Sequence, residues 1–191
     1  PILVFSSYIG GSNTDVVSAI EVNSSSNVYI AGFTESADFP TVGGQQSVIG
    51  GSSGDAFVAR VNNNGVSFAF ATFLGGTDLD YAASIALDGS DNVYISGVTT
   101  STDFPLQSAY QSSRNGPSDL FVAKLNNTGS TLLYSTYLGG SADDSNNDIG
   151  VDGSDNTYVL GQTSSADYPT LNPVQNTYQG NTDLVLTKLN S

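Results

Sequence analysis

The residues best suited to bind a ligand are aspartates that recur in short polar turns. One set follows a pair of glycines, and a second set lies in Asp-Gly-Ser-Asp-Asn turns. Ca²⁺ takes six to eight oxygen ligands, and closely spaced carboxylates in glycine-containing turns can supply some of them. The candidate ligands are Asp78, Asp80, Asp88, Asp91, Asp143, Asp144, Asp152 and Asp155.

A structural interpretation of the same aspartates stays open. No segment matches the twelve-residue calcium-binding loop, because the glutamate at the end of that loop is missing. Asp and Asn side chains also close tight turns by accepting hydrogen bonds from nearby backbone N–H groups. The sequence therefore leaves two alternatives for these residues, Ca²⁺ ligands or turn caps, and we expect no other cofactor.

Catalytic chemistry finds little support in the composition. The chain has no His and no Cys, so the Ser–His and Cys–His nucleophile systems are excluded. A glycoside hydrolase needs only two carboxylates, but none of the 18 acidic residues stands apart from the repeated pattern as part of such a pair. Acids at equivalent positions of each repeat indicate a structural role, and we expect no enzymatic activity.

The few basic residues share one recurring position. Arg60, Lys124 and Lys188 occupy the same place in three similar segments, and only Arg114 lies elsewhere. A position that is always basic predicts a fixed acidic or carbonyl partner. We expect this partner to be the aspartate at the head of the same strand or the aspartate of an Asp-aromatic-Pro loop.

The composition favours an extracellular or cell-surface protein, with chance or lineage bias in residue usage as the alternative. The chain is rich in Ser, Thr, Asn and Gly, has only four basic residues, and lacks Cys and Met. Two Asn-X-Ser/Thr sequons, at Asn23 and Asn126, lie in predicted turns where a glycan would be accessible. A glycoprotein is therefore one interpretation, and unused sequons are the other.

Charge and hydropathy limit the partners. The net charge of −14 over 191 residues repels nucleic acid phosphates and anionic lipid head groups. No run of 18 apolar residues is present, so we expect no membrane span.

The organising element is a segment that the chain repeats three times. It consists of two aromatic residues separated by two small ones, then an aliphatic residue and two glycines, and its last glycine falls at positions 11, 76 and 140. The copies are thus 65 and 64 residues apart, which indicates a repeat architecture. The repeats divide the chain into 1–11, a single outer strand, then 12–76, 77–140 and 141–191.

Each repeat predicts four antiparallel strands and no helix. A short strand, a tight polar turn and a strand of β-branched and aromatic residues come first, for example at 93–98. A glycine in that second strand, at 32, 97 and 161, predicts close approach of a neighbouring backbone or ring. An Asp-aromatic-Pro loop, whose aromatic ring we expect to plug the space beneath it, leads to a third strand, and the repeated aromatic segment is the fourth.

Four-stranded units that repeat in tandem are typical of propeller blades. The motifs Tyr-Ser-Thr-Tyr-Leu-Gly-Gly, Asp-Gly-Ser-Asp-Asn-x-Tyr-Val and Asp-Tyr-Pro, followed by Asp-Leu-x-x-x-Lys-Leu-Asn, resemble the bacterial SBBP β-propeller repeat. This resemblance covers all three repeats. It implies an all-β fold of propeller-type blades on secreted or surface proteins, with no general enzymatic activity, and usually in longer arrays than three blades.

The two ends of the chain do not match. Residues 3–9 predict a fourth strand with no preceding blade, whereas the third repeat stops after its third strand at 183–189. Three blades are too few to close a ring, since propellers have four to eight. We therefore expect the N-terminal strand to complete the last blade of a neighbouring copy. The predicted donor residues are Phe5, Tyr8 and Ile9, and the predicted acceptors are Leu184, Leu186 and Leu189.

The sequence leaves two alternative functions open. The first is an extracellular structural subunit that associates head to tail by strand donation, as a filament or a closed ring, with copies of itself as partner. The second is a cell-surface binding module for a glycan or protein ligand, excerpted from a longer propeller array.

Overall fold

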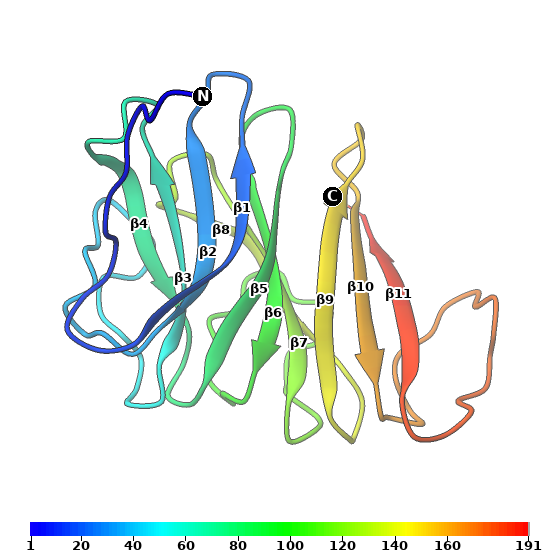
Figure 1. Ribbon diagram of the computed structural model, residues 1–191. Helices are drawn as coiled ribbons and strands as arrows, with labels where there is room; N and C mark the ends of the chain where they lie inside the picture. Colours follow the sequence, from blue (N-terminus) through cyan, green and yellow to red (C-terminus); the bar gives the residue numbers. More distant parts are fainter. Residues whose placement is uncertain (191) are drawn as a thin grey trace.

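The computed structural model describes residues 1–190 and confirms the all-β architecture (Figure 1). Three antiparallel sheets follow one another along the chain. Blade 1 contains β1 (Asp15–Val22), β2 (Val28–Thr34), β3 (Asp55–Val61) and β4 (Phe68–Leu74). Blade 2 contains β5 (Asp80–Leu87), β6 (Val93–Thr99), β7 (Asp119–Leu125) and β8 (Leu132–Leu138), and blade 3 contains only β9 (Asp144–Val151), β10 (Thr157–Thr163) and β11 (Asp183–Leu189).

The turn residues act as the sequence predicts. The β5–β6 and β9–β10 hairpins place Asp91 and Asp155 at φ of 62° and 64°, the left-handed region that Asp and Asn tolerate best among residues with side chains. In the first of these turns, Asp88 accepts hydrogen bonds from the backbone N–H of Ser90 and Asn92. These bonds close the hairpin without a ligand.

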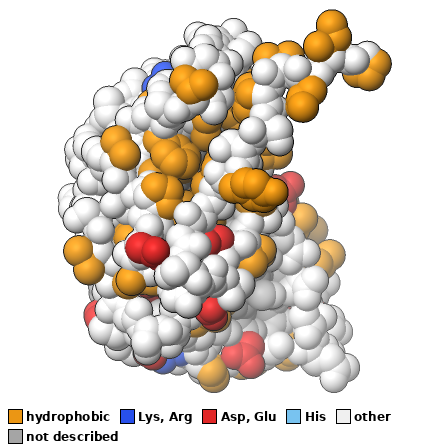
Figure 2. Space-filling view, turned by 60° about the vertical axis from the view of Figure 1, so that its left-hand side comes forward, with side chains coloured by type: hydrophobic (Ala, Val, Ile, Leu, Met, Phe, Trp, Pro, Cys, Tyr) orange, Lys and Arg blue, Asp and Glu red, His pale blue; other side chains and the backbone are white. Residues whose placement is uncertain are grey.

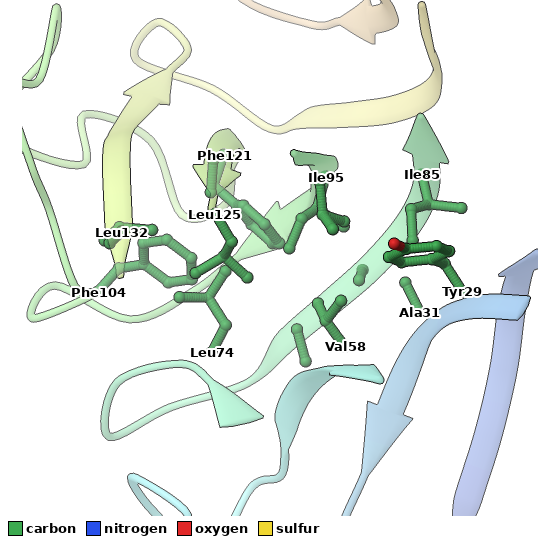
Figure 3. Close-up of a cluster of buried hydrophobic side chains, with 14 of the residues drawn as sticks. Tyr29, Ala31, Val58, Leu74, Ile85, Ile95, Phe104, Phe121, Leu125 and Leu132 are labelled. Carbon is green, nitrogen blue, oxygen red and sulfur yellow. The ribbon is translucent and has the colours of Figure 1, made fainter. Parts of the chain in front are cut away.

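The core lies between the blades. We call the face of a blade that points to the preceding blade its front, and the face that points to the next blade its back. The back face of blade 1, with Tyr29, Ala31 and Val58, packs against the front face of blade 2, with Ile85 and Ile95 (Figure 3). A second cluster joins blade 2 to blade 3 in the same way. No blade covers the front face of blade 1, where a third cluster with Ile30, Phe57 and Phe73 is nevertheless buried, and no blade covers the back face of blade 3.

Two sequence-based expectations about packing are confirmed. The aromatic residues of the Asp-aromatic-Pro loops, Phe39, Phe104 and Tyr168, are buried, and the Phe104 ring lies 4.5 Å from that of Phe121. At Gly97, a Cβ atom would lie 2.0 Å from the carbonyl oxygen of Tyr81. This glycine therefore permits the close approach of β5 to β6.

The N-terminal segment is not part of a sheet. Residues 1–14 contain no strand in the structure, so the strand expected at 3–9 is not formed in the single chain. The segment crosses blade 1, whereas β11 lies on the opposite side of the molecule (Figure 1). Residues 1–190 also contain no helix that is long and apolar enough to cross a membrane.

Candidate functional site: the open edge of blade 3

The position left open in blade 3 is defined by what fills it in blade 2. There, β8 pairs with β7 on one side, with Leu120 opposite Leu138 and Phe121 opposite Tyr137. On its other side β8 contacts the long loop after Phe104, where Gln111 bridges to Tyr137. The fourth strand of a complete blade thus lies in a slot between the third strand and this loop, and β4 occupies the same slot in blade 1.

In blade 3 this slot has its walls but no strand. Leu184 and Leu186 on β11 are each 73% exposed, whereas the equivalent residues of β7, Leu120 and Val122, are fully buried in the cluster between blades 2 and 3, so the face of β11 beside the slot is uncovered as well. The loop wall contributes Leu171 and further apolar residues, which are also exposed. Exposed leucines of this kind on a free sheet edge form a surface that favours pairing with another strand.

The three predicted acceptor residues lie on two different faces of blade 3. Leu184 and Leu186 point to the free back face of blade 3. Leu189 instead packs against the cluster between blades 2 and 3. The open face is completed by Leu160 of β10, which is 40% exposed.

The predicted donor residues lie on the front of blade 1, in the place that an outer strand of a preceding blade would take. The Phe5 ring covers Gly65 so closely that a Cβ atom there would lie 2.3 Å from it, and Phe70 of β4 covers Gly129 of blade 2 in the same way, at 2.2 Å. Phe5 thus contacts blade 1 as its counterpart Phe70 contacts blade 2.

The other two donor residues remain accessible. The side chain of Tyr8 is fully exposed and that of Ile9 is 36% exposed. They line a shallow apolar groove with Val16 and Val17 of β1, and Figure 2 shows hydrophobic side chains gathered in a hollow on this side of the molecule. A strand pairing with residues 3–9 would enter this region.

Buried aspartates at the heads of the strands join adjacent blades. Asp80 of β5 accepts hydrogen bonds from the Gly76 N–H at 2.7 Å and from the Ser101 hydroxyl at 2.8 Å. Asp55 of β3 accepts a bond from the side-chain amide of Gln46 at 2.9 Å. Burial raises the pKa of each carboxyl to about 6, and nearby Asp103 adds to both shifts. The carboxyls of Asp55 and Asp80 both lie against the Gly75–Gly76 turn that connects blade 1 to blade 2.

The eight predicted Ca²⁺ ligands are dispersed. Asp80 and Asp144 are buried in the bonds between blades, Asp88 and Asp152 close hairpins, and the other four lie in turns. Residues 1–190 contain no group of three or more His, Cys, Asp or Glu side chains that could hold a metal ion. Asp88 and Asp152 are turn caps, and Ca²⁺ binding stays an untested prediction.

The two predicted glycosylation sites are turn residues with engaged side chains. The amide of Asn23 donates to Asp91 at 2.8 Å, and the carbonyl oxygen of Asn126 accepts from the Ser130 N–H at 3.0 Å. Both residues are partly buried. Glycosylation at these positions remains a prediction.

The expected partner of the repeated basic residue is wrong. Lys124 contacts neither the aspartate at the head of its strand nor an Asp-aromatic-Pro loop. Its Nζ lies 3.2 Å from Asp88 of the hairpin turn and 4.6 Å from the centre of the Tyr94 ring. Lys188 repeats this arrangement with Asp152 and Tyr158. The reason is cross-strand register, because Lys124 lies opposite Tyr94, close to the end of the sheet where the hairpin turns.

Replacing Lys124 with Met should destabilise the fold by about 1–3 kcal/mol, because it leaves the buried Asp88 carboxylate without its counter-charge. Lys188→Met is the matched control. The side chain of Lys188 is 51% exposed, against 11% for Lys124, so its ion pair is screened by water and its loss should cost under about 1 kcal/mol. Equal losses in urea unfolding of the two variants would contradict this assignment.

The sequence reasoning overlooked a recurring glutamine. Gln46, Gln111 and Gln175 follow the aromatic residue of each Asp-aromatic-Pro loop at the same distance. In blades 1 and 2 this glutamine bonds both to the third-strand aspartate and to the first glycine after the fourth strand. Its recurrence at one repeat position is the signal that could have revealed it.

Comparison with known families agrees with this architecture. Residues 70–105 and 133–169 match the family model described as SBBP, beta-propeller repeat. Each match begins in the fourth strand of one blade and ends after the first hairpin of the next, at the Asp-aromatic-Pro motif. Two stretches of the chain thus match SBBP beta-propeller repeats, a family that is generally non-catalytic and suggests a binding or structural module. Among curated proteins, none matched the sequence.

Proposed function

We propose that this protein is an extracellular structural subunit that assembles head to tail with copies of itself by strand donation. Residues 3–9 of one copy fill the slot between β11 and the adjacent loop of another. The observation that carries this proposal is the pairing of two incomplete features, an open fourth-strand slot in blade 3 and an unpaired segment of fourth-strand sequence on blade 1.

The complete blades give the register of this pairing. In blade 1, Ala56 pairs with Leu74 and Phe57 pairs with Phe73. Transferred to blade 3, this register places Leu184 opposite Ile9 and Val185 opposite Tyr8 of the incoming segment. The backbone N–H and C=O groups of the β11 edge then gain partners, each at about 1 kcal/mol.

Strand donation also brings the two free faces of the stack together. The back face of blade 3, with Leu160, Leu184 and Leu186, would cover the front face of blade 1, as the back face of blade 1 covers the front of blade 2. Burial of apolar surface adds about 25 cal/mol for each square ångström. Since blade 1 already holds Phe5, part of the ordering cost of the donor segment is met before association.

This contact is heterologous, because donor and acceptor are different surfaces. Such a contact closes into a ring when the rotation between copies permits it and otherwise propagates as a filament. Two copies would form a ring of six blades, which lies in the usual range. The acidic surface and the Ser-, Thr- and Asn-rich composition support an extracellular or cell-surface location.

Removal of residues 1–9 should abolish assembly, since it removes the donor. In a gentler variant, Tyr8→Asp places a charge in the slot and leaves the fold intact, because Tyr8 is fully exposed in the single chain. Light scattering coupled to size exclusion, together with electron microscopy, should show oligomers or fibres for the natural chain and monomers for both variants.

Tyr110→Asp is the matched control. Tyr110 is also exposed, but it lies on the loop of the complete blade 2, so this variant should assemble normally. Intact oligomers after removal of residues 1–9 would refute strand donation. A natural chain that remains monomeric at high concentration would do the same.

A further inference from the structure

The two glycines after each fourth strand lie in a socket built by two neighbouring blades. The N–H of Gly75 donates to Gln46 Oε1 at 3.1 Å, and the N–H of Gly76 donates to Asp80 Oδ2 at 2.7 Å. The first acceptor belongs to the blade that contains the strand, and the second belongs to the next blade. Gly139 and Gly140 repeat both bonds, with Gln111 and Asp144, at 3.1 Å and 2.7 Å.

The same socket excludes any side chain at the first glycine. A Cβ atom on Gly75 would lie 2.5 Å from Asp55 Cγ and 2.7 Å from Asp80 Oδ2. At Gly139 the corresponding distances, to Asp119 and Asp144, are 2.6 Å and 2.7 Å. Two buried carboxylates from adjacent blades therefore occupy the space that a side chain would need.

Around the glycines of the N-terminal segment, only one half of such a socket is present, and blade 1 supplies it through Asp15. The N–H of Gly11 donates to Asp15 Oδ2 at 2.8 Å, as Gly76 does to Asp80. A Cβ atom on Gly10 would lie 2.5 Å from Asp15 Oδ2, and the three atoms nearest to it all belong to Asp15. The contacts to a glutamine and a third-strand aspartate, seen at Gly75, are not made here.

The other half of the socket is present, without its glycine, in blade 3. Gln175 Nε2 donates to the carbonyl of Thr177 at 2.9 Å, as Gln111 Nε2 donates to Ser113 at 2.9 Å. Asp183 Oδ2 accepts the backbone N–H of Gln179 at 2.9 Å, as Asp119 Oδ2 accepts that of Asn115 at 3.0 Å. The loop of blade 3 thus makes two of the bonds of a filled blade, while the bond from Gln111 Nε2 to Asp119 has no counterpart between Gln175 and Asp183.

We infer that Gln175 and Asp183 of one copy and Asp15 of the next close one glycine socket around Gly10, and that Gln175 and Asp183 determine which segment the open edge of blade 3 accepts. The partner that fits is a linear peptide with the pattern of residues 5–11, which ends in two glycines. This inference rests on the proposed strand donation and adds its specificity determinants.

A labelled peptide with the sequence of residues 1–13, which lacks Asp15, tests by fluorescence anisotropy the half of the socket that Gln175 and Asp183 supply. The receptor is the full-length Tyr8→Asp chain, whose slot is not filled by other copies. We expect the natural peptide to bind and a peptide with Gly10→Ala to bind at least tenfold more weakly. Gln175→Ala in the receptor should weaken binding of the natural peptide by a similar factor.

Two control variants separate recognition from folding. Gln45→Ala removes an exposed glutamine of the blade 1 loop and should leave peptide binding unchanged. Gln175→Ala should melt at the same temperature as its parent because the Gln175 side chain is exposed, whereas Gln111→Ala should melt at a lower temperature because blade 2 is complete.

The possible failures can be told apart. If the natural peptide binds but neither Gly10→Ala nor Gln175→Ala weakens binding beyond twofold, the socket inference is wrong and strand donation stands. If the natural peptide does not bind at all and the natural chain is monomeric, strand donation itself is wrong, and the inference fails with it.

Discussion

Alanine at position 97 should destabilise the protein by at least about 3 kcal/mol, because an inserted methyl group meets backbone rather than a movable side chain. Its Cβ would lie 2.0 Å from the carbonyl oxygen of Tyr81 and 2.7 Å from the Phe121 ring. β5, which carries Tyr81, is the blade 2 strand that packs against both blade 1 and β9 of blade 3, so it cannot withdraw without disrupting the core. For a chain of this length the loss corresponds to roughly 6–12 °C in melting temperature.

Thermal unfolding monitored by circular dichroism measures this effect, and two further variants calibrate it. Gly89→Ala should be within about 0.5 kcal/mol of the natural chain, since no atom lies within 4 Å of its added Cβ. Gly32→Ala creates the same 2.0 Å clash, with the carbonyl of Val16, but on the front face of blade 1, which no other blade covers. Because β1 can move outward, its cost should fall between the other two. A Gly97→Ala chain that melts with the natural protein would contradict this account of the blade.

Local chemistry made much of this fold predictable from sequence. The β-branched and aromatic residues of 93–98 predict the buried strand β6, and the Asp-Gly-Ser-Asp-Asn turns predict the hairpins beside it. The repeat then transfers each assignment to equivalent positions. Gly97 illustrates the limit of this reasoning, since its close contact was predictable but the identity of the contacting atom, the Tyr81 carbonyl oxygen, was not.

Features that depend on a partner across space were not predictable in this way. Residues 3–9 have the sequence of a fourth strand but form none in the single chain, because a strand needs a neighbour for its hydrogen bonds. The ion pair of Lys124 with Asp88 depends on the register of β6 and β7. Pairing of Asp55 with Asp80 around Gly75 depends on how blade 1 stacks on blade 2.

Stability should be highest near pH 4 and should fall toward pH 7. Burial, aided by the charges of nearby carboxylates, raises the pKa of Asp55 and of Asp80 to about 6. The ordinary pKa of aspartate, 3.8, applies to the unfolded chain. The folded state therefore retains these protons more tightly, so its advantage is complete below pH 4 and is lost as pH rises through about 6. For one such group the loss is about 2–3 kcal/mol.

A second set of aspartates opposes this trend in acid. Hydrogen bonds from the backbone N–H groups of residues 12, 77 and 141 lower the pKa of Asp38, Asp103 and Asp167, respectively. Their contribution is present above pH 4 and is lost as pH falls through their lowered pKa values. These carboxyls are exposed to solvent, which limits their effect. Together, the two sets of aspartates place the maximum of folding stability between the pH range in which the exposed set is lost and the pH range in which the buried set is lost.

The Asp80→Asn variant isolates the buried carboxyls. Its amide oxygen can still accept the hydrogen bond from the Gly76 N–H, while the charge beside Asp55 is removed. We expect a melting temperature several degrees above that of the natural chain at pH 7 and a flatter dependence between pH 5 and 7. Asp78→Asn, in the exposed part of the same turn, should leave the slope unchanged. A natural chain whose melting temperature rises steadily from pH 5 to 7 would contradict this prediction. Stability increases with pH only where folding releases protons, which would mean that the folded state lowers the pKa of these carboxyls instead of raising it.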